Sequence, residues 1–255
     1  MIIALSLTFN EAGFLVAVAF CAGMVRGFSG FALSALFMSL SVLILPPIAL
    51  LPVCWVMEAV ASTMLVRGGW SEADRSMALG LIAGVLFGMP IGLTVTGWMH
   101  ENDSRLVALL MIIILASLQL VRIRIQALAS KPGLIGSGIL AGFATGIASL
   151  GGMVVALYVL SQDRPTPVMR ATLIFYVMLS SVVVLIWLLT LGVMDWLAIK
   201  RGLAMSIPVT AGVLLGQFMF RPSIERYYKT FCLVLLLGLA TASLFHTSGF
   251  VGWFG

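Results

Sequence analysis

Residues 22–30 read Ala22-Gly23-Met24-Val25-Arg26-Gly27-Phe28-Ser29-Gly30 and interrupt a long apolar run with glycines, one serine and one arginine. Apolar residues lead up to this break from Phe14 and continue after it to Leu45. An α-helix rises about 1.5 Å per residue, so each arm of roughly 14 residues covers only about 20 Å of the roughly 30 Å hydrocarbon core of a bilayer. Each arm is therefore predicted to be a half-span. Two shapes remain open, an over-long bent helix and a hairpin that enters the membrane and returns.

The break occurs a second time in the chain. Its glycine pattern returns as Ala141-Gly142-x-x-x-Gly146, followed by Ile147-Ala148-Ser149-Leu150-Gly151-Gly152. Apolar arms again flank it, and prolines follow both broken segments, Pro46 and Pro47 after the first and Pro165 and Pro167 after the second. A break copied once in each half of a membrane chain is typical of a transporter binding site.

The composition indicates an integral membrane protein. Of the 255 residues, 62% are hydrophobic and 9% are charged, whereas a soluble domain carries about 25% charged residues. The apolar runs are continuous and not alternating, which favours an all-α fold over a β-barrel. The net charge of +5 comes from basic residues spaced singly in short loops, a pattern typical of an inner (plasma) membrane protein and not of a nucleic-acid-binding face.

The chain is predicted to contain two repeats, residues 1–128 and 129–255, with about eight membrane segments in all. Each repeat begins with a broken segment and continues with three spans, near 48–66, 77–99 and 106–120 in the first and near 171–191, 202–220 and 231–245 in the second. Glycines four residues apart in the third and seventh segments, Gly84, Gly88, Gly92, Gly212 and Gly216, are predicted to allow close helix packing.

Loop charges distinguish the two shapes of the broken segments. If both are re-entrant hairpins, most basic residues share one face, namely Arg67, Arg75, Arg122, Arg124, Lys131, Arg164, Arg170, Arg221, Arg226 and Lys229. Only Arg105, Lys200 and Arg201 then lie on the other face. If both segments crossed the membrane, the basic residues would divide almost evenly. The positive-inside rule therefore favours hairpins, inverted repeats and two periplasmic termini.

The hairpin tips are predicted to bind an anion. The second arm of a hairpin presents its N-terminus at the tip, where free N–H groups and the helix dipole place partial positive charge. Glycine and serine suit such a tip because the backbone can approach a ligand there, and the expected contacts are Gly27, Ser29, Gly30, Gly146, Ser149, Gly151 and Gly152. The cysteines lie inside apolar runs, so neither a metal nor a cofactor is expected.

Arg26 and Glu58 are the charged residues expected at membrane depth. Arg26 stands beside the first break and is a candidate ligand for an oxyanion, because guanidinium forks onto such groups. The alternative is an ion pair with Glu58. Glu58 itself is either a carrier of a coupling proton or a structural partner of Arg26.

Polar residues near the second tip complete the candidate site. Arg170 either contacts substrate or anchors the inner face, and Thr145 and Tyr176 either contact substrate or pack between helices. Tyr176 stands roughly where Glu58 stands in the first repeat.

These features together resemble the TauE/SafE (TSUP) family of bacterial sulfite exporters over almost the whole chain. The resemblance implies a permease for small sulfur-containing anions such as sulfite or organosulfonates, commonly an exporter. We expect alternating access with the anion held at the two tips, and no catalysis. In place of the family's consecutive glycines this chain has Arg26-Gly27-Phe28-Ser29-Gly30, a difference that points to a doubly charged or bulkier anion.

Other functions remain open at this point. The Gly27-Phe28-Ser29-Gly30 motif and His246 resemble the Ser/His pair of rhomboid-like intramembrane proteases. An anion channel and the membrane subunit of an ATPase are further alternatives, although the chain lacks a phosphate-binding G-x-x-x-x-G-K-[ST] loop. A homodimer and proton coupling are both compatible with the sequence.

Overall fold

The computed structural model describes residues 7–65, 73–121, 131–160, 162, 166–219 and 225–247. The predicted turn residue Pro165 and the basic loop residues Arg67, Arg122, Arg124, Arg164 and Arg221 lie outside these ranges. Within them the chain forms helices and no strand, in the order α1 (Phe9–Ser29), α2 (Leu33–Ser41), α3 (Pro47–Leu65), α4 (Arg75–Trp98), α5 (Glu101–Val121), α6 (Lys131–Ala148), α7 (Gly151–Leu160), α8 (Thr166–Thr190), α9 (Trp196–Met219) and α10 (Glu225–Thr247).

The predicted all-α membrane fold is confirmed. Seven helices in the described part of the chain are long and apolar enough to cross a membrane. Large apolar side chains such as Phe87, Ile91 and Phe218 lie exposed on the outer faces of these helices. Water would disfavour so many exposed apolar groups, whereas lipid accommodates them.

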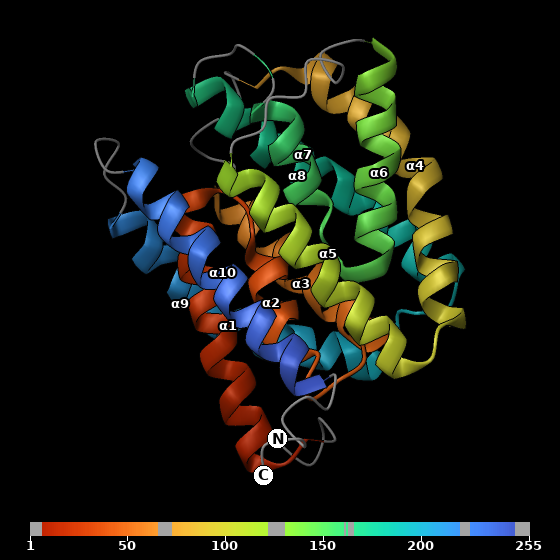
Figure 1. Cartoon of the computed structure of the whole chain (residues 1–255), viewed down its shortest axis with the longest axis vertical. Coiled ribbons are helices and arrows are strands. Elements are labelled where there is room, and N and C mark those ends of the chain that lie inside the picture. The colour runs from red at the N-terminus through yellow and green to blue at the C-terminus, as the bar shows by residue number, and fades with distance from the viewer. Residues whose placement is uncertain are drawn as a thin grey trace.

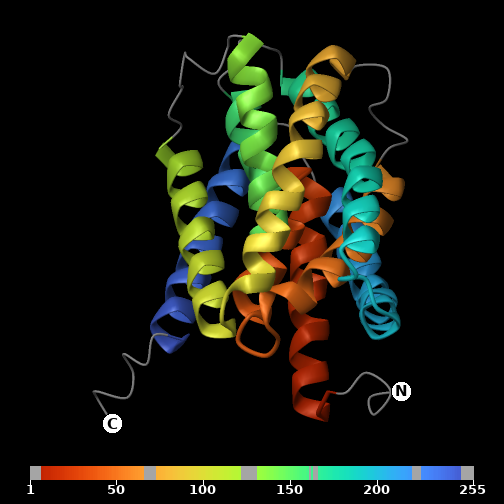
Figure 2. The same ribbon diagram turned by 90° about the vertical axis from the view of Figure 1, so that its right-hand side faces the viewer.

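The first broken segment is a helix, a turn and a shorter helix. Thr8 and Glu11 form a capping box at the start of α1, which continues through Gly23 and Gly27 to Ser29. The chain then turns at Gly30 and Ala32, whose φ angles of 78° and 71° are left-handed, and α2 leads back toward the end from which α1 came (Figures 1 and 2). The prediction that the first arm is only a half-span is wrong, because Phe9–Gly27 alone is long enough to cross a membrane.

The second broken segment has the same shape. α6 continues through Gly142 and Gly146 to Ala148, Ser149 turns the chain with a φ of 58°, and α7 follows. α6 enters from the end of the molecule opposite to the one at which α1 begins and α10 ends (Figure 2). The two short turns therefore approach one another in the interior.

Gly23 and Gly27 of the first break, and Gly142 and Gly146 of the second, lie within helices and not in the turns. A Cβ atom added to Gly23 or Gly27 of α1 would collide with the backbone of Val209 or Val213 in α9. The collisions are reciprocal, because Gly212 and Gly216 of α9 press against α1 in the same way. The backbones of α1 and α9 therefore lie in direct contact, as small residues permit in membranes.

The same backbone-to-backbone packing at glycines, which we call the glycine interlock, joins α4 to α6. Gly84, Gly88 and Gly92 of α4 face the backbone of α6 around Gly138, Ile139 and Phe143, and Gly142 and Gly146 face α4 in return. The predicted packing role of the glycines on α4 and α9 is thus confirmed. Their partners are the glycines that the sequence analysis assigned to the breaks.

Each major contact between helices has a counterpart when the two halves of the chain are exchanged. Exchanging α1–α5 for α6–α10 in order turns the α1–α9 contact into the α6–α4 contact, and these are the two most extensive in the molecule. The same exchange turns α3–α9 into α8–α4 and α2–α10 into α7–α5, which are also observed. Helices of one half thus pack mainly against helices of the other.

The glycine interlock predicts a sharp difference between two alanine variants of α4. Gly88→Ala places a methyl group against the Ile139 carbonyl, and overpacking of this kind costs about 1–3 kcal/mol. Gly97→Ala meets nothing within 4 Å and gains helix propensity. In detergent, Gly88→Ala should melt roughly 5–10 °C below the parent protein, and Gly97→Ala should not. Equal melting temperatures for the two variants would contradict the interlock.

Candidate functional site

A pocket lies between the two turns and the facing helices α3 and α8. About 580 Å³ in and around it is not filled by atoms, and this volume includes open solvent. Seven of the predicted site residues line it, namely Arg26, Glu58, Thr145, Ser149, Gly151, Gly152 and Tyr176. The structure therefore brings together residues from both breaks, although they are more than a hundred positions apart in the sequence.

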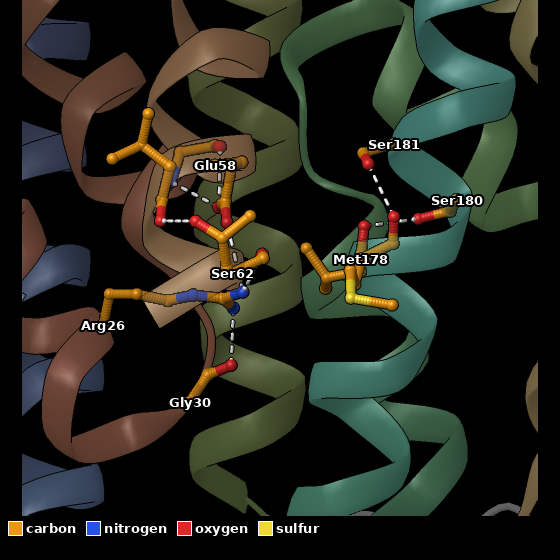
Figure 3. Close-up of polar contacts among 11 residues, drawn as sticks. Arg26, Gly30, Glu58, Ser62, Met178, Ser180 and Ser181 are labelled. Carbon is orange, nitrogen blue, oxygen red and sulfur yellow. Dashed lines mark hydrogen bonds and ion pairs between the residues drawn. The ribbon is translucent and has the colours of Figure 1, made fainter. Parts of the chain in front are cut away.

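Arg26 is held by three acceptors. Its side chain is 1% exposed. One terminal nitrogen, Nη1, donates to the carbonyl of Gly30 at the first turn, and the other, Nη2, donates to Ser62 Oγ at 3.0 Å (Figure 3). The same Nη2 lies 3.3 Å from Glu58 Oε2. The ion pair that the sequence analysis named as the alternative role of Arg26 is present, and Arg26 also lines the pocket.

Glu58 is a residue of α3, and its side chain caps the N-terminus of α2. Its Oε1 accepts hydrogen bonds from the Ser34 backbone N–H at 3.3 Å and from the Ser34 hydroxyl at 2.9 Å. The first N–H groups of a helix have no partner within the helix and carry partial positive charge, so a carboxylate is favourable there. With Arg26 on its other oxygen, Glu58 forms the structural link predicted as one of its two roles.

Close packing at the second turn requires glycine. A Cβ atom on Gly151 would collide with the Thr145 hydroxyl and the Ala141 carbonyl, and it would lie 3.4 Å from the Tyr176 hydroxyl. Thr145, Ser149, Gly151 and Tyr176 are thereby drawn together at the start of α7. This tip contributes polar atoms to the pocket but no charged side chain.

Some predicted site residues lie elsewhere. Gly27 and Gly146 face α9 and α4, where their missing side chains permit helix contact, and the Gly30 carbonyl accepts from Arg26. The backbones of Ser29 and Arg170 are helical, but their side chains lie outside the described part of the structure.

Several pocket residues were missed by the sequence analysis. Ser34, Trp55, Ser180 and Ser181 line the pocket, and Ser62 holds Arg26. The serines were embedded in apolar runs, where hydroxyls normally bond to their own helix. The one available signal was helical spacing, because Trp55, Glu58 and Ser62 share one face of α3.

Neither a metal centre nor a catalytic pair is evident in the described residues. No group of three His, Cys, Asp or Glu side chains is placed to bind a metal, and Cys21, Cys54 and Cys232 are free thiols. His246 is exposed in the last turn of α10, near the end of the molecule at which α1 begins, whereas Ser29 is at the far end of α1 (Figure 2). The protease alternative is therefore not favoured.

A helical membrane protein with two interior turns, and a pocket between them that holds an arginine, has the features of a membrane permease. The sequence model of the sulfite exporter TauE/SafE family matches residues 15–243, and the chain belongs to that family. The family implies a transporter of the sulfite or sulfonate exporter type. No curated protein and no solved structure matches the chain.

The contacts of Arg26 predict strong coupling between two substitutions. Arg26→Met leaves Glu58 as an unpaired, mostly buried carboxylate, and breaking such a pair costs about 3–5 kcal/mol. Adding Glu58→Gln removes that charge, so the double variant should recover most of the lost stability. The measurement is thermal unfolding of the parent, both single variants and the double variant in detergent. Additive losses would show that the pair contributes nothing of its own.

Proposed function

We propose that this protein is a secondary transporter that exports a small sulfur-containing anion, sulfite or an organosulfonate, held between the two turns during transport. The observation that carries the proposal is the pocket in which Arg26 from the first turn meets Ser149 and Gly151 from the second. The family adds the class of substrate and the direction of transport.

Arg26 is the residue proposed to bind the anion. Two of its nitrogens are already committed to Gly30 and Ser62, so the guanidinium is held in place before substrate arrives. Its Nε is buried and has no hydrogen-bond partner in the described structure. A sulfonate or sulfite oxygen would accept from it, and guanidinium binds such groups through parallel hydrogen bonds.

Glu58 is proposed to compete with the anion. Its carboxylate neutralises Arg26 and takes the donors of Ser34. Protonation of Glu58 would remove this negative charge and leave the positive charge of Arg26 available to substrate. The other titratable groups near Glu58 are Cys54 on the same helix and Tyr176, which lines the same pocket from α8. The anion would therefore bind more tightly when Glu58 is protonated.

The two halves, residues 1–128 and 129–255, are proposed to be inverted repeats that move by alternating access. The matching helix pairings support this. The residues that line the pocket come from both halves of the chain, and a homodimer stays a prediction.

The protein is proposed to lie in the bacterial inner membrane with both termini in the periplasm. The end with Arg75 would then face the cytoplasm, and the end with Arg105, Lys200 and Arg201 would face the periplasm, as the loop charges favour. Labelling of single cysteines at the two ends with a membrane-impermeant maleimide tests this orientation. Labelling from outside at residue 75 and not at residue 105 would contradict it.

Transport by Arg26 variants tests the proposed site. The double variant Arg26→Gln/Glu58→Gln lacks both charges and so should fold but lose saturable sulfite flux in proteoliposomes. Losing a charged hydrogen-bonding group costs about 1.5–3 kcal/mol, which is roughly a 10- to 150-fold weaker affinity. Glu58→Gln alone is the matched control and should retain binding. Saturable flux in the double variant would show that Arg26 is not part of the binding site. Flux that does not saturate in the parent protein would favour a channel.

The pH dependence of flux tests the coupling role of Glu58. In the parent protein, anion affinity should rise as pH falls, because protonation of Glu58 frees Arg26. Glu58→Gln mimics the protonated state at every pH, so its affinity should be high and independent of pH. The measurement is the concentration of sulfonate at half-maximal flux across a series of pH values. An unchanged pH response in Glu58→Gln would exclude Glu58 as the coupling group.

A further inference from the structure

Three hydroxyl groups that line the pocket, one on α6 and two on α8, donate their protons to backbone carbonyls of their own helices. Thr145 Oγ1 donates to the Ala141 carbonyl at 2.7 Å, Ser180 Oγ donates to the Val177 carbonyl at 3.2 Å, and Ser181 Oγ donates to the Met178 carbonyl. All three residues line the pocket. A hydroxyl has one proton and two lone pairs. Once the proton is bonded to the helix backbone, the hydroxyl can only accept a hydrogen bond from a ligand.

One aromatic donor beside the pocket is bonded to the backbone as well. The Trp55 indole N–H donates to the Ser181 carbonyl at 2.8 Å, from α3 across to α8. The hydroxyls of Ser180 and Ser181 therefore present acceptors to the pocket, set among the apolar side chains of Val177 and Val184.

The opposite side of the pocket contains the Arg26–Glu58 ion pair. Arg26 belongs to the first turn, and its Nε is a buried donor with no partner in the described structure. Figure 3 shows the Arg26–Glu58 group on one side and Ser180 and Ser181 on the other. A ligand that satisfies both sides has an anionic group at one end and a hydrogen-bond donor at the other.

We infer that Ser180 and Ser181 are specificity-determining residues that select sulfonates bearing a hydroxyl or ammonium group on the carbon chain. This rests on the proposed binding of a sulfonate at Arg26. The donor of the ligand tail would bond to the free lone pairs of the two serine hydroxyls. An alkyl tail of the same size would cover those lone pairs without offering them a donor.

Two ligands of equal size test this inference, 2-hydroxyethanesulfonate and propane-1-sulfonate. They have the same charge and the same number of heavy atoms, and they differ only in a hydroxyl group against a methyl group. The hydroxyl ligand should bind the parent protein about 3- to 10-fold more tightly, as one added hydrogen bond implies. A purely apolar wall would give the reverse order, because the methyl group gains more from burial. The measurement is isothermal calorimetry on the purified full-length protein.

Variants then locate the selectivity. Ser180→Ala/Ser181→Ala removes the acceptors, so the preference should fall to equality or reverse, while the affinity for propane-1-sulfonate should not fall. Ser206→Ala on α9 is the matched control, because Ser206 also donates to its own helix, at the Gly202 carbonyl, and does not line the pocket. It should leave the preference unchanged.

The outcomes separate this inference from the proposed function. If both sulfonates bind and propane-1-sulfonate binds equally or more tightly, the inference is overturned and the proposed anion site stands. A preference that survives in Ser180→Ala/Ser181→Ala also overturns it. If neither sulfonate binds but sulfite does, the inference fails and the substrate is the inorganic anion. If no sulfur anion binds, both proposals fail.

Discussion

Two helices of this protein end in the interior of a membrane-embedded molecule, and their free backbone groups must find partners there. Water satisfies such groups at the surface, but lipid cannot. At the first turn, Arg26 supplies a donor to the Gly30 carbonyl, and Glu58 accepts from the first turn of α2. At the second turn, the Ser149 N–H bonds to the Thr145 carbonyl at 2.9 Å. The groups that end the helices are thus also the groups that line the pocket.

The turns are held in place by helices from the opposite half of the chain. α1 lies against α9 and α6 lies against α4, backbone to backbone, through glycines on both members of each pair. Such contacts disfavour sliding of one helix along the other, because a side chain brought to the position of a glycine would collide with the neighbouring backbone. The α1–α9 and α4–α6 pairs are therefore natural rigid units, and the pocket lies between them. In the proposed transport cycle, motion between these units would open the pocket without breaking either interlock.

The ion pair between Arg26 and Glu58 keeps both charges paired when no substrate is bound. An arginine that lacked a partner at this depth would be costly, and Glu58 prevents that cost by acting as an internal anion at the end of α2. In the proposed site, an incoming anion would replace Glu58 or meet it in protonated form. This requirement links the stability of the empty site to the proposed coupling with protons.

The predictions that are confirmed are those for which a sequence pattern depends on one segment alone. The helical class, the position of most spans and the place of Arg26 beside a break all follow from local hydrophobicity and from the rarity of charge in lipid. The prediction for the break itself is wrong, because Gly27 was expected at the hairpin tip and lies within α1 against α9. In a membrane helix glycine is tolerated where another backbone approaches closely, and only the partner helix reveals which role applies.

Hydrophobicity, length and loop charge were sufficient to determine an all-helical membrane protein with two interrupted segments and a charged residue near the first interruption. These properties depend on each residue's transfer from water to lipid, which hardly depends on its neighbours. Tertiary structure alone decided that the turns lie at Gly30–Ala32 and Ser149, that Arg26 is neutralised by Glu58, and that Trp55, Ser180 and Ser181 face the same pocket. Those outcomes depend on which helices meet, and the distances and hydrogen bonds that settle them join residues far apart in the chain.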